Sequence, residues 1–378
     1  MRRVVIIGGG FSGLFAARRL RKSDPNIEIT LIDKKQGSDF LPTLPDCLGR
    51  GIEPQYLTYD ITDMAQRLRF QFINDEVTAV DFYKKEVTLK NRVLSYDFLL
   101  IASGSETNFY GNENIQKYAY KLDDANDVRT ICRVLKGDAY SAYIIGGGGY
   151  TGVEVATNLR CFLGKDKKAG KVVIVERAPS ILGPLPEWMK KYVSDNLKVL
   201  DVEVFVDSAI EKIDGEKVYV SGARVFDNAV VIWAAGVKTA AFIQNLTVDK
   251  NPQGRIKVDE FLRLNENCFA AGDAAFFSYN NAYLRMAMQF SIVEGDLAAK
   301  NIINSIKGRK LKKYRPIDMG YIIPMANNRS CGVIMGFNLK GLLPTIFHFI
   351  MCVYRSFNWR NKFGIIKGLI KGLIKGDE

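Results

Sequence analysis

The sequence predicts an α/β protein in which two parallel sheets are flanked by helices. Two stretches, beginning near residues 4 and 142, each contain an apolar strand, a glycine-rich turn, a helix and a second strand that ends in an acid. A third observation is a change after about residue 310, where the chain becomes basic and apolar. Together these features predict two Rossmann-like domains followed by a distinct C-terminal segment.

The first stretch, residues 4–33, has the glycine pattern of a dinucleotide site. Gly8, Gly10 and Gly13 form a GxGxxG sequence between a β-branched strand and an Ala- and Leu-rich helix. The first glycine allows a tight turn, the second lets the backbone approach a pyrophosphate, and the third lets helix and strand pack closely. The pyrophosphate would lie at the helix N-terminus, where free N–H groups favour negative charge. Asp33 follows at the distance expected for an acid that bonds a ribose hydroxyl.

The second stretch repeats this arrangement. Gly147, Gly149 and Gly152 form another GxGxxG after a strand, and the next strand, "KVVIVER", leads to Glu176. A carboxylate there accepts hydrogen bonds from an adenosine ribose diol and repels a 2′-phosphate, so the site favours NADH over NADPH. Arg177 beside it moderates this preference, because an arginine can receive part of a phosphate charge.

Two dinucleotide sites in one chain indicate that one nucleotide delivers a hydride and the other receives it. Two further segments favour FAD in the first site. "YDFLLIASGSETN" at 96–108 is a strand entering a small-residue turn, and "NCFAAGDAAFF" at 267–277 is a strand ending in Gly272-Asp273. Asp273 can bond the ribitol and pyrophosphate side of a flavin; the simpler alternative is that it caps a helix. We therefore expect a discontinuous FAD domain over 1–110 and 240–315, with an NAD(H) domain over 111–239 inserted in it.

The candidate binding residues come from these motifs and strand ends. Those expected to bind FAD, non-covalently, are Gly8, Gly10, Phe11, Ser12, Gly13, Asp33, Lys34, Ala102, Gly104, Gly272 and Asp273. Those expected to bind NADH, as a substrate, are Gly147, Gly149, Tyr150, Thr151, Gly152, Glu154, Glu176 and Gly236. No metal site is expected, since the six cysteines have no paired spacing and the chain has a single histidine, His348.

These residues resemble the type II (alternative, single-subunit) NADH:quinone dehydrogenases, within the two-dinucleotide-binding flavoproteins. The similarity covers roughly residues 2–305 and rests on segments such as "DFLPTLPDCLGRG", "SGSETNFYG", "GGGGYTGVEVA", "VIWAAGV" and "FAAGDAAFF". It implies hydride transfer from NADH to FAD and then two-electron reduction of a membrane quinone, without proton pumping. It also implies a homodimer formed through the C-terminal region.

By this resemblance, two residues are the catalytic candidates. Glu154 would lie near the nicotinamide and the flavin, where it would position NADH or relay protons. Gln289 would lie on the quinone-proximal helix and against FAD. The chain departs from the family pattern around that helix, with Met288 before Gln289 and Val293-Glu294 where the family carries glutamines. A later lysine-glycine pair is replaced by Met319-Gly320.

These departures leave the electron acceptor open. A sulfide:quinone oxidoreductase would use paired cysteines, for which Cys161 and Cys331 are the candidates, although such an enzyme does not need the NADH motif. A soluble NADH reductase with a protein or peroxide acceptor is a second alternative, with Cys47 as the reactive thiol of a peroxidase. A nucleotide-sensing scaffold without turnover is a third.

The C-terminal end holds the whole charge excess. From residue 300 on there are 15 Lys and Arg and three acids, a net +12 equal to that of the entire chain. The end, "FGIIKGLIKGLIKG", predicts an in-plane amphipathic helix on an anionic membrane surface. Its glycines each cost about 1 kcal/mol relative to alanine, so we expect it to fold on lipid. The alternative is a helix packed on the protein or on a partner. The candidate membrane residues are Trp359, Ile366, Leu369, Ile370, Leu373, Lys367, Lys371 and Lys375.

The location follows from these features. The first residues, "MRRVVIIGGGFSGLFA", resemble the start of a signal peptide, but glycines interrupt the apolar run and no cleavage site follows. No stretch approaches the about 20 apolar residues of a membrane span. We expect a peripheral protein at the cytoplasmic face of the cell membrane, attached and dimerised through residues 316–378, with no nucleic-acid partner.

Overall fold

The structure, a computed structural model, describes residues 1–279 and 282–374, and the C-terminal side chains as far as Lys371. The chain forms two compact units. Unit 1 comprises Met1–Asp39, Tyr59–Glu106 and Val237–Ile317. Unit 2 comprises Phe40–Thr58, Thr107–Gly236 and the residues from Asp318 on.

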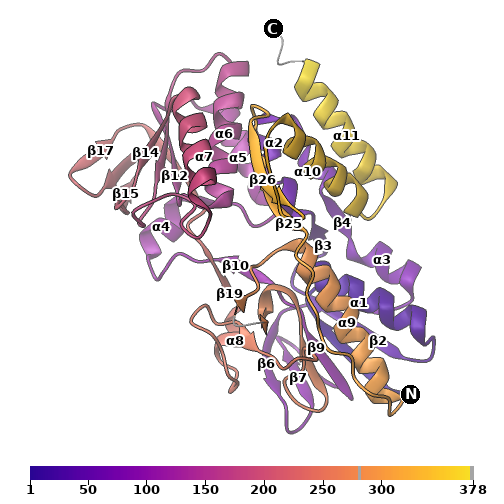
Figure 1. Cartoon of the computed structure of the whole chain (residues 1–378). Helices are drawn as coiled ribbons and strands as arrows, with labels where there is room; N and C mark the ends of the chain where they lie inside the picture. Colours follow the sequence, from indigo (N-terminus) through magenta and orange to yellow (C-terminus); the bar gives the residue numbers. More distant parts are fainter. Residues whose placement is uncertain (280–281, 375–378) are drawn as a thin grey trace. The chain divides into compact units, whose positions relative to one another are not determined.

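Unit 1 is built on a five-stranded parallel sheet (Figure 1). Its order is β21 (Cys268–Ala270), β9 (Phe98–Ile101), β1 (Arg3–Ile7), β2 (Glu28–Asp33) and β5 (Gln71–Asn74). In the register, Ile7 lies opposite both Ile32 and Ile101. The carboxyl ends of these strands therefore meet at one edge of the sheet, which is where nucleotides bind in folds of this kind.

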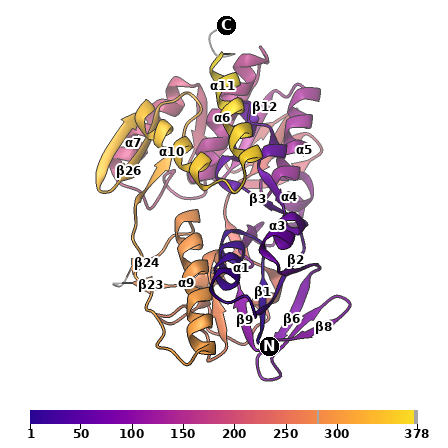
Figure 2. The ribbon, with the colours of Figure 1, turned by 90° about the vertical axis from the view of Figure 1, so that its right-hand side faces the viewer.

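Two long helices of unit 1, α1 (Phe11–Ser23) and α9 (Met288–Ile306), pack side by side (Figure 2). They can approach closely because Gly295 has no side chain. A Cβ at this position would collide with the Ser12 backbone. The Ser12 hydroxyl also donates to the Ser291 carbonyl at 2.8 Å. The remaining elements of unit 1 are α3 (Ile61–Leu68), α8 (Ala241–Gln244), η3 (Gly272–Ala274), β6 (Val77–Asp81), β7 (Glu86–Leu89), β8 (Val93–Ser95), β20 (Ile256–Lys257), β22 (Ala275–Phe276), β23 (Ser278–Tyr279) and β24 (Ala282–Tyr283).

Unit 2 contains a second five-stranded parallel sheet. Its order is β11 (Tyr120–Lys121), β18 (Ala229–Trp233), β12 (Ala142–Gly146), β13 (Lys171–Val175) and β14 (Val202–Phe205). The other elements of this part are α4 (Glu113–Tyr118), α5 (Ala125–Gly137), α6 (Tyr150–Lys165), α7 (Glu187–Val199), β15 (Ile210–Asp214), β16 (Lys217–Val220) and β17 (Arg224–Phe226). The predicted fold class, α/β with two Rossmann-like parallel sheets, is confirmed.

The chain passes between the units in two short ribbons. One joins β10 (Ser105–Thr107) to β19 (Val237–Thr239), and the other joins β3 (Gly37–Asp39) to β4 (Thr58–Asp60). Between β3 and β4 lie η1 (Leu41–Thr43), α2 (Asp46–Gly49) and η2 (Pro54–Tyr56), which all belong to unit 2.

The C-terminal elements also belong to unit 2. They are the sheet of β25 (Gly320–Ile323), β26 (Ser330–Ile334) and β27 (Phe337–Gly341), followed by α10 (Leu342–Arg355) and α11 (Trp359–Ile374). Arg50 connects residues 40–58 to this region by donating to Asn328 Oδ1 at 2.8 Å and to the Met325 carbonyl at 2.7 Å. The division differs here from the expected one, in which residues 40–58 were part of the FAD domain and residues 316–378 stood apart.

Helix α11 packs against residues 51–56 of its own unit (Figure 2). A Cβ at Gly364 would collide with Tyr56, and one at Gly368 would lie 2.7 Å from the Ile52 Cα. The Asn361 side chain donates to the Tyr56 carbonyl at 2.6 Å. These two glycines therefore allow close packing within the protein. The packing matches the alternative expectation, a helix packed on the protein, rather than a helix that folds only on lipid.

Candidate nucleotide sites

The turn between β1 and α1 is shaped for a ligand. Gly8 has φ +109°, and a Cβ at Gly13 would collide with the Gly8 carbonyl, so both glycines are required by the protein itself. At Gly10, in contrast, a Cβ would meet no atom of the described chain within 4 Å. Helix α1 begins there without a side-chain cap. The turn thus leaves open space against a helix N-terminus, as a pyrophosphate requires.

Asp33 is held rigidly at the end of β2. Its carboxylate accepts the Gly9 N–H at 2.6 Å and the Lys35 N–H at 2.7 Å. A carboxylate has about four lone-pair sites, so two remain for a ribose diol. Lys34 beside it forms an ion pair with Glu106 at 3.3 Å. Phe11 and Ser12 lie in the first turn of α1, with Ser12 buried against α9.

Two other chain segments converge on this edge of the unit 1 sheet. Ser105 donates to Asp273 Oδ2 at 2.8 Å, which links the turn after β9 to the turn after β21. Ala102 lies against Gly8, and Gly104 adopts φ +68° in the same small-residue turn. Within the described residues, the buried hydroxyl of Ser103 has no hydrogen-bond partner. A ligand oxygen would satisfy this hydroxyl, so the residues present fit a bound nucleotide.

Glu294 is a component of this site that the sequence motifs did not identify. Its side chain is 3% exposed, and Oε2 accepts the Gly272 N–H at 2.7 Å. Burial raises the pKa of Glu294 to about 8. A signal was present, because Glu294, Ala298 and Ile302 recur every four residues on one helix face, and the latter two are buried apolar residues.

The turn between β12 and α6 in unit 2 repeats the first turn. Gly147 has φ +108°, a Cβ at Gly152 would collide with the Gly147 carbonyl, and a Cβ at Gly149 would meet no described atom within 4 Å. Glu176 accepts the Gly148 N–H at 2.6 Å and the Ala178 N–H at 2.7 Å. The two sites therefore share both the open glycine and the doubly bonded acid.

The remaining candidates of the second site lie around this turn. Tyr150 packs edge-to-face on Tyr321 of β25 with ring centroids 6.2 Å apart, and Thr151 is exposed beside it. Gly236 has φ +143° and is approached by the Tyr110 hydroxyl, which donates to the Ala235 carbonyl at 3.0 Å.

The two catalytic candidates lie in different units. Glu154 is half-buried on α6 in unit 2, where burial raises its pKa well above the ordinary value and the nearby Asp46 raises it further. Asp46 is itself buried and paired with Arg50 at 3.1 Å, and burial raises its pKa to about 6. Gln289 lies half-buried in the first turn of α9 in unit 1. No sequence motif predicted Asp46 as the acid beside Glu154.

The cysteines do not form a reactive pair in the structure. All six are free. Cys331 is fully buried in β26, and burial raises its pKa to about 12, while Cys161 donates to the Gly49 carbonyl at 3.5 Å. Burial also raises the pKa of Cys47. Reactive cysteines need a lowered pKa, so Cys331 and Cys47 have the opposite environment.

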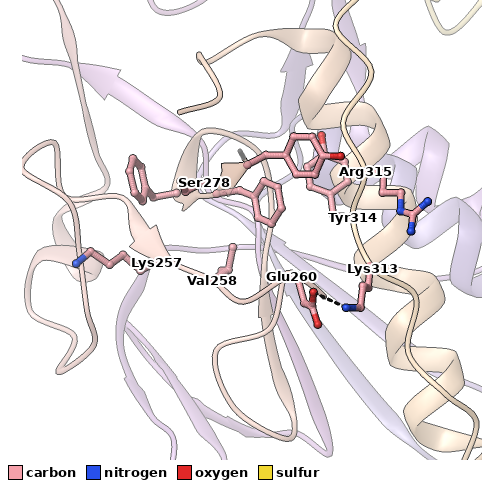
Figure 3. Close-up of a pocket in the computed structure, with 10 residues that line it drawn as sticks. Lys257, Val258, Glu260, Ser278, Lys313, Tyr314 and Arg315 are labelled. Atoms are coloured by element: carbon pink, nitrogen blue, oxygen red, sulfur yellow. Dashed lines mark ion pairs between the residues drawn. The ribbon is translucent and has the colours of Figure 1, made fainter. Parts of the chain in front are cut away.

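Unit 1 also contains a pocket of about 490 Å³ (Figure 3). The ring of Tyr314 lines it, and the ion pair of Lys313 with Glu260, at 2.9 Å, lies at its wall. Its other lining residues are Lys257, Val258, Phe276, Phe277, Ser278, Tyr279 and Arg315.

The exposed face of α11 carries apolar and basic side chains. Trp359 is 74% exposed, Phe363 65% and Ile370 52%, whereas Ile365 on the inner face is fully buried. Of the other membrane candidates, Ile366, Lys367 and Lys371 are exposed and Leu369 is half-buried, while the Leu373 side chain and Lys375 lie outside the described part. No helix in residues 1–279 and 282–374 combines the length and apolar character of a bilayer span.

Comparison with known proteins agrees with this double site. A family model described as pyridine nucleotide-disulphide oxidoreductase matches residues 2–293. The type II NADH:quinone oxidoreductase of Staphylococcus haemolyticus is 25% identical over 369 residues, covering 90% of this chain and 91% of that protein.

Solved structures share the fold. NDH2 from Plasmodium falciparum in complex with NADH has a TM-score of 0.84 at 18% identity and covers 98% of both chains. The sulfide:quinone oxidoreductase of Aquifex aeolicus has a TM-score of 0.79 at 18% identity, covering 96% of this chain and 92% of that one. Because the family model spans most of the sequence, this chain belongs to the pyridine nucleotide-disulphide oxidoreductase family.

Proposed function

We propose that the protein is a type II NADH:quinone oxidoreductase, which holds FAD in unit 1, oxidises NADH bound in unit 2 and passes two electrons to a membrane quinone. One observation carries the proposal: two separate turns each combine an open glycine, at Gly10 and Gly149, with an acid that accepts two backbone N–H groups. A dehydrogenase without a flavin needs only one such site. The name of the Staphylococcus haemolyticus relative agrees with this activity.

The residues of unit 1 would bind FAD without a covalent link. The open turn at Gly10 and the α1 N-terminus would receive the pyrophosphate, and Asp33 would accept the ribose hydroxyls. Asp273, fixed by Ser105, would bond the ribitol side. The flavin, when bound, supplies the redox chemistry, and the chain supplies binding, orientation and electrostatics.

The residues of unit 2 would bind NADH in the same way. Gly149 would lie against the pyrophosphate, and Glu176 would accept the ribose diol and repel a 2′-phosphate. Burial and the nearby Asp46 raise the pKa of Glu154, which favours its protonated form and suits it to deliver a proton to an acceptor.

The cysteines favour NADH over sulfide as the electron donor. Cys331 is buried with a raised pKa, and Cys161 donates to a backbone carbonyl. The test is steady-state turnover with NADH or sulfide as donor and a soluble quinone analogue as acceptor. We expect NADH-driven turnover that is unchanged in C161S and C331S. Sulfide-driven turnover that both variants abolish would contradict the proposal.

We further propose that the protein attaches peripherally to the anionic, cytoplasmic face of the membrane. Its contact surface is the outer face of α10 and α11, with the exposed residues Leu342, Leu343, Ile346, Phe347, Ile350, Tyr354, Trp359, Phe363, Ile366 and Ile370. Residues 319–376 contain no acid, so the charge of this region complements anionic lipid. A lipid-soluble quinone requires such a location.

Vesicle flotation tests this attachment. The full chain should float with vesicles containing an anionic lipid, less with neutral ones, and I366S/I370S should reduce flotation severalfold. V199S is the matched control, since Val199 is 68% exposed at the end of α7. If the variant pair instead dissociates a homodimer and flotation is unchanged, the surface is a dimer interface and the membrane proposal is wrong.

A further inference from the structure

Glu294 lies where α9 meets the turn after β21. Its carboxylate accepts the Gly272 N–H at 2.7 Å, and Gly272 directly precedes Asp273 in the chain. It also faces Arg255 and the buried hydroxyl of Tyr314, whereas α1 presents the uncharged Ser12 to the same turn. Glu294 and Arg255 are 3% and 5% exposed, respectively.

The charges in this cluster do not balance. Arg255 is fixed by donating to the Asp273 carbonyl at 3.1 Å and to the Leu284 carbonyl at 3.2 Å. Among the described residues it is the one cation that faces the carboxyls of Asp273 and Glu294. Two ionised carboxylates beside a single guanidinium would leave one negative charge uncompensated in a buried place, which is strongly unfavourable. The cluster therefore binds a proton.

Glu294 is the carboxyl that holds this proton. Asp273 accepts the Ser105 hydroxyl at 2.8 Å and is half-buried, so its ionised form is the better stabilised of the two. Burial raises the pKa of both carboxyls and brings that of Glu294 to about 8. Glu294 is therefore mostly protonated at neutral pH and loses its proton as the solution becomes mildly alkaline.

We infer that Glu294 is a redox-linked proton site: in mildly alkaline solution, where its carboxyl is ionised in the oxidised protein, it takes up a proton when the FAD bound at the Gly272–Asp273 turn gains negative charge and releases it when that charge leaves. This inference rests on the proposed binding of FAD in unit 1. The two electrons come from the reductant and remain on the flavin. The proton comes from solvent and forms the O–H bond of the Glu294 carboxyl. Because binding free energies are reciprocal, protonation of Glu294 in turn favours the reduced flavin.

Tyr314 contacts both the buried carboxyl and the pocket described above. Tyr314 lines that pocket (Figure 3). Its hydroxyl is buried beside Glu294 and has no hydrogen bond of ordinary geometry within the described chain. The hydroxyl is thus placed to donate to Glu294 when the carboxyl ionises. Such a donor stabilises the charged form and lowers the carboxyl pKa.

The test is the reduction potential of the FAD-bound protein between pH 6.5 and 9.5, measured with mediators and dithionite. Each proton taken up with a two-electron reduction changes the equilibrium constant tenfold per pH unit, or 29.6 mV. We expect the wild-type slope to steepen above about pH 8 by up to this amount. In E294Q, which keeps an oxygen for the Gly272 N–H, the added slope should be absent.

Two further variants make the result specific. Y314F should move the break in slope to higher pH, because the donor that stabilises the carboxylate is lost. E260Q, on the wall of the same pocket, should leave the curve unchanged. Identical slopes in wild type and E294Q would overturn the inference, even if NADH reduces the flavin normally. A protein that binds no FAD would overturn both this inference and the proposed function.

Discussion

Glu176 should decide the choice between NADH and NADPH. Its carboxylate accepts two backbone N–H groups, at 2.6 and 2.7 Å, which leaves its other lone pairs for a ribose diol. The substitution Glu176→Gln keeps the shape but removes the charge, and its amide presents a donor to one of these N–H groups. Hydrogen bonds to a charged group contribute about 1.5–3 kcal/mol.

This loss should raise the KM for NADH by about 10- to 100-fold, since 1.4 kcal/mol corresponds to a factor of ten. NADPH should not suffer in the same way, because the repulsion of its 2′-phosphate is also removed. The ratio of kcat/KM for NADH to kcat/KM for NADPH should therefore fall at least about tenfold. The assay is steady-state oxidation of each nucleotide with a saturating quinone analogue, with FAD content measured in parallel.

E187Q is the matched control. Glu187 lies in the same unit, with a side chain 86% exposed and paired only at the surface with Lys190, so its loss should change neither KM. Equal increases of KM for NADH and NADPH in E176Q would refute the assignment of Glu176 to the ribose. A wild-type enzyme that prefers NADPH would refute it as well.

Other variants test other parts of the account. In G149A the methyl group meets no atom of the described residues within 4 Å, so stability should change by at most about 1 kcal/mol while the KM for NADH rises at least tenfold and FAD stays bound. I365A should destabilise α11 by about 2–5 kcal/mol, seen as faster hydrogen exchange there, whereas I366A on the exposed face should not. Burial lowers the pKa of His348 to about 4, so the unfolded chain binds a proton that the folded one does not, and wild-type stability should fall as pH drops from about 6.5 to 4. In H348Q, the free energy of unfolding measured in urea should fall by up to about 3 kcal/mol less over this pH range than in the wild type. Identical pH dependence in both proteins would contradict a lowered His348 pKa.

The nucleotide turns could be predicted from sequence because each depends on local rules. Gly8 and Gly13 are needed by the turn and by the packing of helix on strand, and Asp33 ends the next strand at a fixed distance. The same rules apply to Gly147 and Glu176. Glycine spacing and strand length record such constraints directly in the sequence.

The contacts of Glu294, Arg255 and Asp46 could not be predicted in this way. Glu294 reaches Gly272 across 22 residues, and Arg50 reaches Asn328 across 278, so no local pattern relates the partners. The glycines of α11 were also ambiguous. A four-residue repeat of glycine and lysine fits a lipid surface, but only the fold shows that Gly364 and Gly368 pack against Tyr56 and Ile52.

We expect the two bound nucleotides to form one electron path from NADH to a quinone. Anaerobic titration of the purified, FAD-bound protein tests it most directly. One equivalent of NADH should bleach the flavin absorbance, and a soluble quinone analogue should then restore it in equal amount. A flavin that NADH leaves oxidised, or that only sulfide reduces, would contradict the account.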